Sequence, residues 1–433
     1  MISALLLFSL SGCWNGKTAP PPGNPGAAAG TADHQEQITL NVWEVWPEKN
    51  DANAKSFYDT LAKWQAEHPK IEIKIFATDS EAYKSKIRTA VAAGEAPDVF
   101  FSWGGGFSKP FAASGAILPL DSYLDDGTLD KLHPGALANY TFDGKVYGLP
   151  YVMWVGVLYC NEELFTKYGV RLPQTNDDLL AAVKIFRRNG VTPLAAGAKD
   201  GWPAMFYQNI YALRSAGAAA CNSALNGGGR FDTQRMEAGT QMLIDLINAG
   251  AFAPDALDFS YDDAKFSFLN GEVPMLYQGS WFAGEIQDPK ESKVCDQVVA
   301  LNWPSLPNGA GNQNDTLGGA IDCFMVSAKT PHKDEAVAFV KYITQNMSRQ
   351  SVEFGAGLSP WKIDATNIQV SPLVKQIMDI STQSQNSVLA WDTSLPGQAA
   401  EELKNLSQEL FAGQITAAEF NRKVQQLKLN MDK

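Results

Sequence analysis

The sequence predicts an α/β protein with more than one hydrophobic core. Strand-like and helix-like stretches alternate from Ile38 to Phe101 and again from Val298 to Ile343, and this pattern favours right-handed crossovers and mostly parallel sheets. The chain has 433 residues, which is longer than a single core usually organises, so two or more core-bearing units are expected. A composition of 45% hydrophobic and 19% charged residues is that of a soluble globular protein.

The first part of the chain contains three strand-like stretches, 38–42, 71–75 and 98–101, separated by two helix-like stretches. Asn50 or Asp51 can cap the first helix, and Gly94 lies where glycine often ends a helix. The apolar residues recur at helical spacing, and they are Phe57, Leu61 and Trp64 in the first helix and Tyr83, Ile87 and Val91 in the second.

Ser102, Trp103 and three glycines, Gly104–Gly106, directly follow the strand predicted at 98–101. Ligands of open α/β sheets bind in the crevice outside the carboxyl ends of the strands. A phosphate-binding loop would also be rich in glycine, but no Gly-Lys-Ser opens a helix after this stretch. We therefore predict that it forms one wall of a ligand cleft.

The middle of the chain contains a long strand-like run that could pass from one domain to another. It lies within 143–161 and includes Gly148 and Gly156. Turn residues and apolar spacing predict further helices over 179–190, 201–214 and 236–247, a polar glycine-rich loop at 222–230, short strands at 271–277, 298–301 and 321–326, and helices at 336–343, 399–411 and 416–428.

Charge and composition exclude several classes of function. The formal net charge is −12, which argues against nucleic acid and anionic membrane surfaces as partners. The four histidines are scattered and there is no Cys-x-x-Cys, so we expect no metal and no cofactor. Aromatic residues make up 11% of the chain, and Trp and Tyr combine an apolar face with a polar group that suits binding surfaces.

The amino terminus has features of an export signal. Ile2 to Leu10 is mostly apolar and is followed by Leu10-Ser-Gly-Cys13, which resembles a lipoprotein signal and its lipobox, although no Lys or Arg precedes Leu5. We predict residues 1–13 as the signal, with Cys13 lipidated, and 14–37 as a Pro- and Gly-rich tether. One disulfide is possible among the other cysteines, but the sequence does not indicate which two would pair. These cysteines are Cys160, Cys221, Cys295 and Cys323.

Several short motifs, taken in order, resemble the extracellular solute-binding proteins of carbohydrate ABC transporters, the maltose-binding type in family 1. Besides the lipobox they are Gly94–Val99, Tyr147–Pro150, Leu158–Phe165, Gly271–Met275, Gly279–Trp281 and Gly318–Ala320. Each motif is weak alone, but their order and spacing extend over nearly the whole chain. Cys160 stands where the family often has a second Tyr.

This resemblance implies a periplasmic-binding-protein-like fold of two α/β lobes that close around a hinge. The first lobe would comprise 38–150 plus 324–356, and the second 151–323 plus 357–433. The resemblance also implies a monomeric lipoprotein, attached to the outer face of the cytoplasmic membrane or lying in the periplasm. It would capture a xylo-, cello-, chito- or malto-oligosaccharide without chemistry and deliver it to permease subunits.

A sugar presents hydroxyls at its edge and an apolar face, so its site needs aromatic rings and planar polar groups. By resemblance, Trp281 and Trp391 occupy ligand-stacking positions and Trp154 lies in the cleft. Further tryptophans lie beside Gly, Pro or Ser, and polar groups flank the predicted strands. The candidates of these two kinds are Trp46, Trp103 and Trp202, and Glu44, Asp51, Ser102, Gly279, Gly318, Gly319 and Asp392.

Two alternatives remain open at this point. One is a binding protein for a non-sugar polyol or a glycerophosphodiester. The other is a surface glycoside hydrolase, which would need two carboxyl groups a short distance apart, one with a raised pKa. Glu44 and Glu285 are possible partners in such a pair, but the sequence contains no nucleophile elbow.

Overall fold

The computed structural model describes residues 37–48, 51–133, 135–363, 368–395 and 397–431. The chain divides into two units, 1–37 and 38–433, and the described helices and strands lie in the second. The predicted signal with Cys13, the predicted tether up to residue 36, and Asn50 lie outside the described residues. Among the residues that are described, no helix is both long and apolar enough to cross a membrane.

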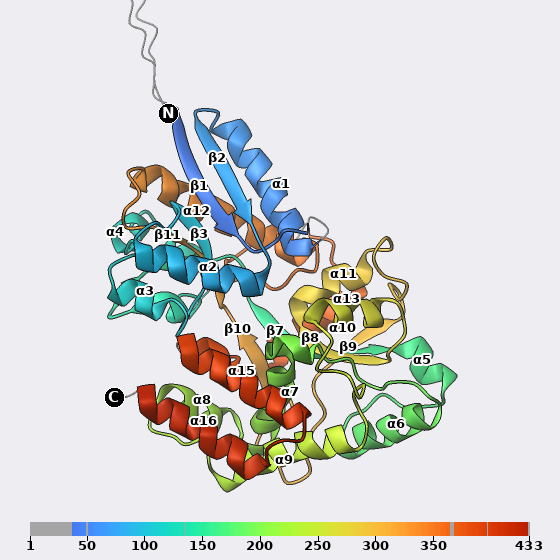
Figure 1. Ribbon diagram of the computed structural model, residues 1–433. Coiled ribbons are helices and arrows are strands. Elements are labelled where there is room, and N and C mark those ends of the chain that lie inside the picture. The colour runs from blue at the N-terminus through green and yellow to red at the C-terminus, as the bar shows by residue number, and fades with distance from the viewer. Residues whose placement is uncertain (1–36, 49–50, 134, 364–367, 396, 432–433) are drawn as a thin grey trace, which may run out of the picture. The chain divides into compact units, whose positions relative to one another are not determined.

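The first sheet has the strand order β2-β1-β3-β11-β6 (Figure 1). Its strands are β1 (Ile38–Glu44), β2 (Ile71–Ala77), β3 (Val99–Trp103), β6 (Gly148–Pro150) and β11 (Asp322–Val326). β1 runs parallel to β2 and β3, whereas β11 runs antiparallel to β3 and β6. Ser102 and Trp103 are thus the last two residues of β3. The sequence pattern predicts both residues directly after this strand rather than within it.

Local signals explain the helices that connect these strands. Asp51 caps α1 (Ala52–Glu67) by accepting hydrogen bonds from the backbone N–H groups of Asn53 and Ala54. Gly94 ends α2 (Ser80–Ala93) in the left-handed conformation, at a φ of 71°, which glycine adopts without steric cost. Both helices confirm the predicted positions.

The second sheet has the order β12-β10-β7-β8, and β9 also pairs with β7. Its strands are β7 (Trp154–Asn161), β8 (Met275–Gly279), β9 (Val298–Leu301), β10 (Thr316–Gly319) and β12 (Ser387–Val388). β7 is antiparallel to β8, β9 and β10, and only β10 and β12 are parallel. The prediction of a mostly parallel sheet in each lobe is therefore wrong. In the first sheet, β11 pairs antiparallel with both of its neighbours, and in the second, β7 enters from the first sheet in the direction opposite to β8, β9 and β10.

Every residue of β7 is buried, since both faces of its sheet are covered. Trp154, Leu158 and Cys160 point into the core formed with α7 (Trp202–Ala216), α9 (Gln234–Asn248) and α15 (Gly397–Phe411). Val155, Val157 and Tyr159 point into a separate core on the other face, formed with α10 (Tyr261–Leu269), α11 (Ala283–Gln287) and α13 (Pro372–Gln383). The alternation follows from the twofold period of a strand.

The chain passes between the two sheets three times, and the first two passages lie close together, where β6 pairs with β11 and β7 pairs with β10. The third passage lies between β11 of the first sheet and β12 of the second. β6 of the first sheet ends at Pro150, and β7 of the second begins at Trp154; β10 of the second ends at Gly319, and β11 of the first begins at Asp322. The indole N–H of Trp361 binds the Pro150 carbonyl at 2.7 Å, and the Asn139 amide binds the Ala320 carbonyl at 2.7 Å. We call the elements built on each sheet the first and the second lobe.

The remaining elements are mostly helical and cover the sheets. In the first lobe they are α3 (Lys109–Ala113), α4 (Asp121–Leu124), α12 (Lys333–Glu353) and the strand pair β4 (Thr141–Phe142) and β5 (Lys145–Val146). In the second lobe they are α5 (Glu162–Lys167), α6 (Asn176–Arg188), α7 (Trp202–Ala216), α8 (Ala218–Asn226), α9 (Gln234–Asn248), α10 (Tyr261–Leu269), α11 (Ala283–Gln287), α13 (Pro372–Gln383), α14 (Trp391–Ser394), α15 (Gly397–Phe411) and α16 (Ala417–Met431). The predicted helical hairpin near the carboxyl end is confirmed by α15 and α16.

The loop predicted at 222–230 is wrong in its first half, where α8 runs to Asn226. Three alanines, Ala218–Ala220, open this helix directly after Gly217, and alanine has the highest intrinsic helix propensity.

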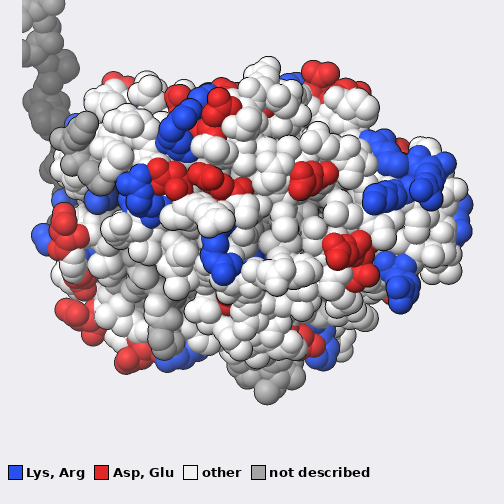
Figure 2. Space-filling model, turned by 90° about the horizontal axis from the view of Figure 1, so that it is seen from below, with Lys and Arg blue, Asp and Glu red and all other residues white. Residues whose placement is uncertain are grey.

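On the face shown in Figure 2, acidic and basic side chains are interspersed and most of the surface carries neither.

Candidate functional site

Five aromatic side chains of the second lobe form a connected group, which we call the aromatic cluster. Its members are Trp154, Trp202, Phe206, Tyr261 and Trp281. The Trp154 ring is stacked on Phe206, with centroids 5.3 Å apart and an interplanar angle of 7°. Trp281 meets Trp154 edge to face at 5.1 Å, and Trp202 lies 4.8 Å from Tyr261. Trp202 and Trp281 are only partly buried, so their rings keep exposed area for a ligand.

Two glycines make room for this cluster. A Cβ atom on Gly279 would lie 2.0 Å from the Trp281 ring, and one on Gly318 would lie 2.0 Å from the Trp154 carbonyl oxygen. Any larger residue would displace a ring or the β7–β10 pairing. The predicted site glycines therefore act by their small size, and Gly319 is the β10 residue directly opposite Trp154.

The first lobe contributes mainly carboxyl groups. Glu44, the last residue of β1, is buried; it accepts hydrogen bonds from the Trp46 backbone N–H and, at 2.7 Å, from the Tyr58 hydroxyl. Burial raises the pKa of Glu44 to about 7, although these two hydrogen bonds act in the opposite direction. Near neutral pH this carboxyl can both donate and accept a proton.

Asp51 lies where the first lobe faces charged groups of the second. Burial raises the pKa of Asp51, while the nearby Lys265 ammonium acts to lower it. Lys265 is itself buried and forms ion pairs with Glu285 at 2.9 Å and with Asp262 at 3.1 Å. The amino end of α1 and the start of α10 are thus coupled through charge.

Asp322 and Trp103 are directly opposite each other in the β11–β3 pairing. Burial raises the pKa of Asp322 to about 7, with Lys84 acting to lower it. The Trp103 ring lies 4.8 Å from Phe101 and 5.0 Å from Phe107, and it packs against the main cores of both lobes. Ser102 is buried beside it, and its hydroxyl is directed to the Trp103 backbone carbonyl at 3.3 Å.

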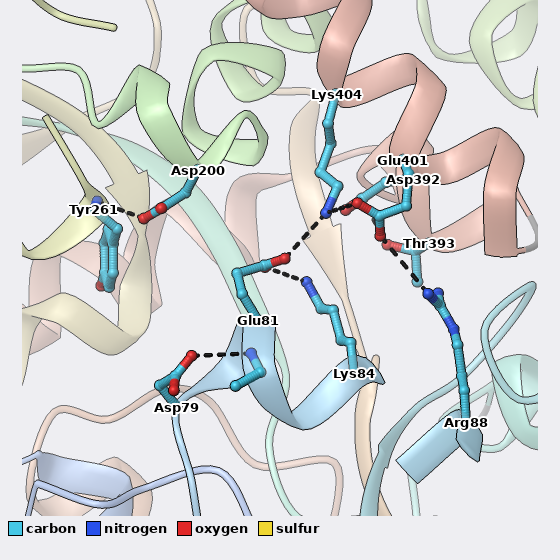
Figure 3. A network of polar contacts seen from close by, with 11 residues as sticks. Asp79, Glu81, Lys84, Arg88, Asp200, Tyr261, Asp392, Thr393, Glu401 and Lys404 are labelled. Carbon is cyan, nitrogen blue, oxygen red and sulfur yellow. Dashed lines mark hydrogen bonds and ion pairs between the residues drawn. The ribbon is translucent and has the colours of Figure 1, made fainter. Parts of the chain in front are cut away.

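A chain of alternating charges joins α2 of the first lobe to α15 of the second, and we call it the charged seam (Figure 3). Glu81 binds Lys84 at 2.7 Å and Lys404 at 3.2 Å. Lys404 also binds Glu401 at 2.8 Å, and Arg88 lies 3.8 Å from Glu401. A small pocket lies beside the seam, and its lining residues are Lys84, Arg88, Glu401, Lys404 and Asp392 together with Trp103, Phe107, Thr393, Leu395 and Ala400.

The three glycines after β3 allow the backbone of the second lobe to approach closely. The N–H of Gly106 donates to the Thr393 carbonyl at 2.7 Å. A Cβ atom on Gly105 would lie 2.6 Å from that carbonyl oxygen, and one on Gly106 would lie 2.6 Å from Leu395. The Gly104–Gly106 stretch is therefore a contact between the lobes.

The structure brings some predicted site residues together and separates others. Trp154, Trp202, Gly279 and Trp281 meet in the aromatic cluster, while Asp51, Trp103 and Asp392 lie where the lobes meet. Trp46 is only 7% exposed and packs edge to face on Phe101 and Tyr151 in the first core. Trp391 is completely buried against Phe231, 4.8 Å away, and its backbone N–H is bound by Asn209, so its ring has no exposed face in this conformation.

Sequence reasoning missed Tyr261, Phe206 and Lys265, which support the cluster. Ser260 and Asp263 form a capping box around the start of α10, and this pattern could have placed Tyr261 at a helix amino terminus. It could not have indicated that the helix lies beside Trp202 and Trp281, because the three residues are far apart in the sequence.

Comparison with known proteins agrees with this architecture. Residues 48–350 match the family described as bacterial extracellular solute-binding protein, and the chain belongs to this family. Its class is therefore a two-lobe protein that binds a solute outside the cell.

A structure from work on xylan utilization by the thermophilic bacterium Caldanaerobius polysaccharolyticus is 40% identical, with a TM-score of 0.86, and the match covers 90% of this chain and 99% of that one. A chitin oligosaccharide binding protein is 25% identical, with a TM-score of 0.83 and coverage of 91% and 98%. An uncharacterized ABC transporter extracellular-binding protein of Pyrococcus horikoshii is 25% identical over 370 residues, which is 84% of this chain and 81% of that protein.

Proposed function

We propose that this protein is the substrate-binding component of an ABC importer, that it captures an oligosaccharide between its lobes, and that it delivers the sugar to permease subunits. The observation that carries the proposal is the aromatic cluster, whose Trp202 and Trp281 rings are only partly buried, while the Asp51 carboxyl of the other lobe lies near Tyr261 and Lys265. Flat rings suit the apolar faces of sugars, and carboxylates accept hydrogen bonds from sugar hydroxyls. The similarity to a structure from work on xylan utilization makes a xylo-oligosaccharide the first candidate, ahead of chito-, cello- and malto-oligosaccharides.

Within this site we assign the stacking role to Trp281 and Trp202, with Trp154 behind them and Trp103 on the opposite wall. Asp51, Asp322 and Asp392 are the proposed acceptors for sugar hydroxyls. Trp46, Ser102 and Trp391 belong to the surrounding framework, because they are buried against protein groups.

We further propose that the lobes comprise 38–150 plus 322–356 and 151–321 plus 357–433, two residues earlier at the second boundary than the sequence predicted, because β11 begins at Asp322 in the first sheet. We also propose that a lipid on Cys13 attaches the monomeric protein to the membrane. The tether at 14–37 would then leave the lobes free to reach the permease.

Binding without turnover is the proposed activity. Glu44 and Glu285 both have pKa values raised to about 7 by burial, as a hydrolase acid would require. However, Glu44 accepts hydrogen bonds from the Trp46 backbone N–H and the Tyr58 hydroxyl. Glu285 accepts a hydrogen bond from the Lys265 ammonium. Because protein groups already bind both carboxyls, we assign them to the framework around the site.

Isothermal calorimetry with xylo-, chito-, cello- and malto-oligosaccharides tests the proposal. We expect binding to one of these series, and we expect Trp281→Ala to weaken it at least about tenfold, about 1.4 kcal/mol, because one stacked ring is lost. Phe266→Ala is the matched control, since this side chain of α10 is 50% exposed and lies outside the aromatic cluster. If no glycan produces heat or a thermal shift, the sugar proposal is contradicted. Release of shorter sugars from any of these ligands would contradict binding without turnover.

A further inference from the structure

Tyr261 holds a central place in the aromatic cluster. It is the first residue of α10, where Ser260 and Asp263 cap each other's backbone. Its own backbone N–H donates to the Asp200 carboxylate at 2.7 Å (Figure 3). Asp200 lies two residues before Trp202, where α7 begins. The starts of α7 and α10 are therefore tied together at the position from which both present a ring.

The side chain of Tyr261 contacts both of the partly buried indoles. Its hydroxyl accepts a hydrogen bond from the Trp281 indole N–H at 2.9 Å, and its ring centroid lies 4.8 Å from that of Trp202. An indole can turn about its side-chain bonds, and a hydrogen bond to its only polar atom limits that rotation. One residue thus limits the orientation of two rings.

Tyr261 is itself supported from within the second lobe. The Lys265 ammonium lies 4.7 Å from the centre of its ring, a cation–π arrangement. Ion pairs with Glu285 and Asp262 fix that ammonium in turn. Burial is the main cause that raises the pKa of Tyr261, so the phenol stays neutral and remains an acceptor for the indole N–H. All of these direct contacts lie within the second lobe, and the first lobe adds only the charge of Asp51 beside Lys265 and Tyr261.

We propose that Tyr261 is a positioning residue of the sugar site: its hydroxyl sets the plane of the Trp281 ring and its own ring supports Trp202, so that the two indoles are aligned before a ligand arrives. This inference rests on the proposed function. Alignment in advance lowers the ordering cost of binding, which is how preorganised sites gain affinity.

Tyr261→Phe tests the proposal because it keeps the ring and removes only the hydroxyl. Fluorine NMR of protein labelled with fluorotryptophan reports on each indole, with the Trp281 and Trp64 signals assigned from Trp281→Phe and Trp64→Phe. Without ligand, we expect Tyr261→Phe to shift or broaden the Trp281 signal and to leave the signal of Trp64, in the first core, unchanged. Oligosaccharide affinity should fall roughly five- to twentyfold, with little change in the melting temperature.

The matched control is Tyr342→Phe, which also removes one tyrosine hydroxyl, in this case one that binds Glu67 in the first lobe. It should change neither the Trp281 signal nor the affinity. An unchanged Trp281 signal in Tyr261→Phe, or a changed signal with unchanged affinity, would overturn the positioning role. If the wild-type protein binds no oligosaccharide, the proposed function fails, while the ligand-free spectra still decide whether Tyr261 orients Trp281.

Discussion

The two lobes contribute different chemistry to the candidate site. The second lobe supplies rings, and each ring is held by its own neighbours: Trp154 by Phe206, and Trp281 by Tyr261. The first lobe supplies mainly carboxyl groups, among them Asp51 and Asp322. The ring surface therefore exists within one lobe, whereas the polar side of the site is completed only where the lobes meet. We infer that affinity depends mainly on the second lobe and that closure depends on contacts with the first.

Trp391 is the exception within the second lobe, and replacing it should have the largest effect. Its ring is 0% exposed, so Trp391→Ala should lower the free energy of unfolding by about 3–5 kcal/mol through loss of burial and creation of a cavity. Trp391→Phe should cost much less, since it keeps a ring and removes an indole N–H that has no acceptor among the described residues. Urea denaturation measures both. A stable Trp391→Ala variant that no longer binds sugar would restore Trp391 as a stacking residue.

The first lobe should respond to pH through Glu44. Its pKa is about 7 in the folded protein against an ordinary value of 4.5, so the folded state binds the proton more tightly than the unfolded state. The resulting stabilisation is present below the lower pKa and is lost as the pH rises through 7, an effect of about 3 kcal/mol at most. Glu44→Gln removes this titration and keeps an acceptor for Tyr58.

We therefore expect the free energy of unfolding of the wild-type protein to fall more steeply than that of Glu44→Gln between about pH 5 and about pH 8. Asp322 titrates in the same sense in both proteins, since burial also raises its pKa to about 7, so the difference between the two curves isolates Glu44. Parallel curves would show that Glu44 titrates in the folded protein as it does in the unfolded chain.

Local chemistry predicted the helices better than it predicted the site. Asp51 and Gly94 marked the start of α1 and the end of α2 correctly, because capping depends on neighbouring residues. The direction of β7 relative to its partners was not predictable in this way, since it depends on strands more than a hundred residues away. Periodicity also cannot separate Trp281 from Trp391: both tryptophans lie in short polar contexts, and only the distant Phe231 shows that Trp391 is core.

The charged seam should have the smallest effect, and it tests the link between the lobes. Glu81 and Lys404 are 3.2 Å apart, but Glu81 is partly exposed, and exposed ion pairs contribute about 0.2–1 kcal/mol. We expect Glu81→Ala and Lys404→Ala each to weaken sugar binding by less than about fivefold, with the loss shrinking at high salt because charges are screened. Lys55→Ala, which breaks the 3.2 Å ion pair with Asp59 within α1, is the control and should leave affinity unchanged.

The reversed pair, Glu81→Lys with Lys404→Glu, separates this attraction from other effects of the two substitutions. If the seam helps to hold the lobes together, each single reversal places like charges at the contact between α2 and α15 and should weaken binding more than alanine does. The double reversal should recover part of that loss, since opposite charges face each other again. Losses that simply add in the double variant would mean that the seam does not couple the lobes, and closure would then rest on the backbone contact between Gly106 and Thr393 and on the sugar itself.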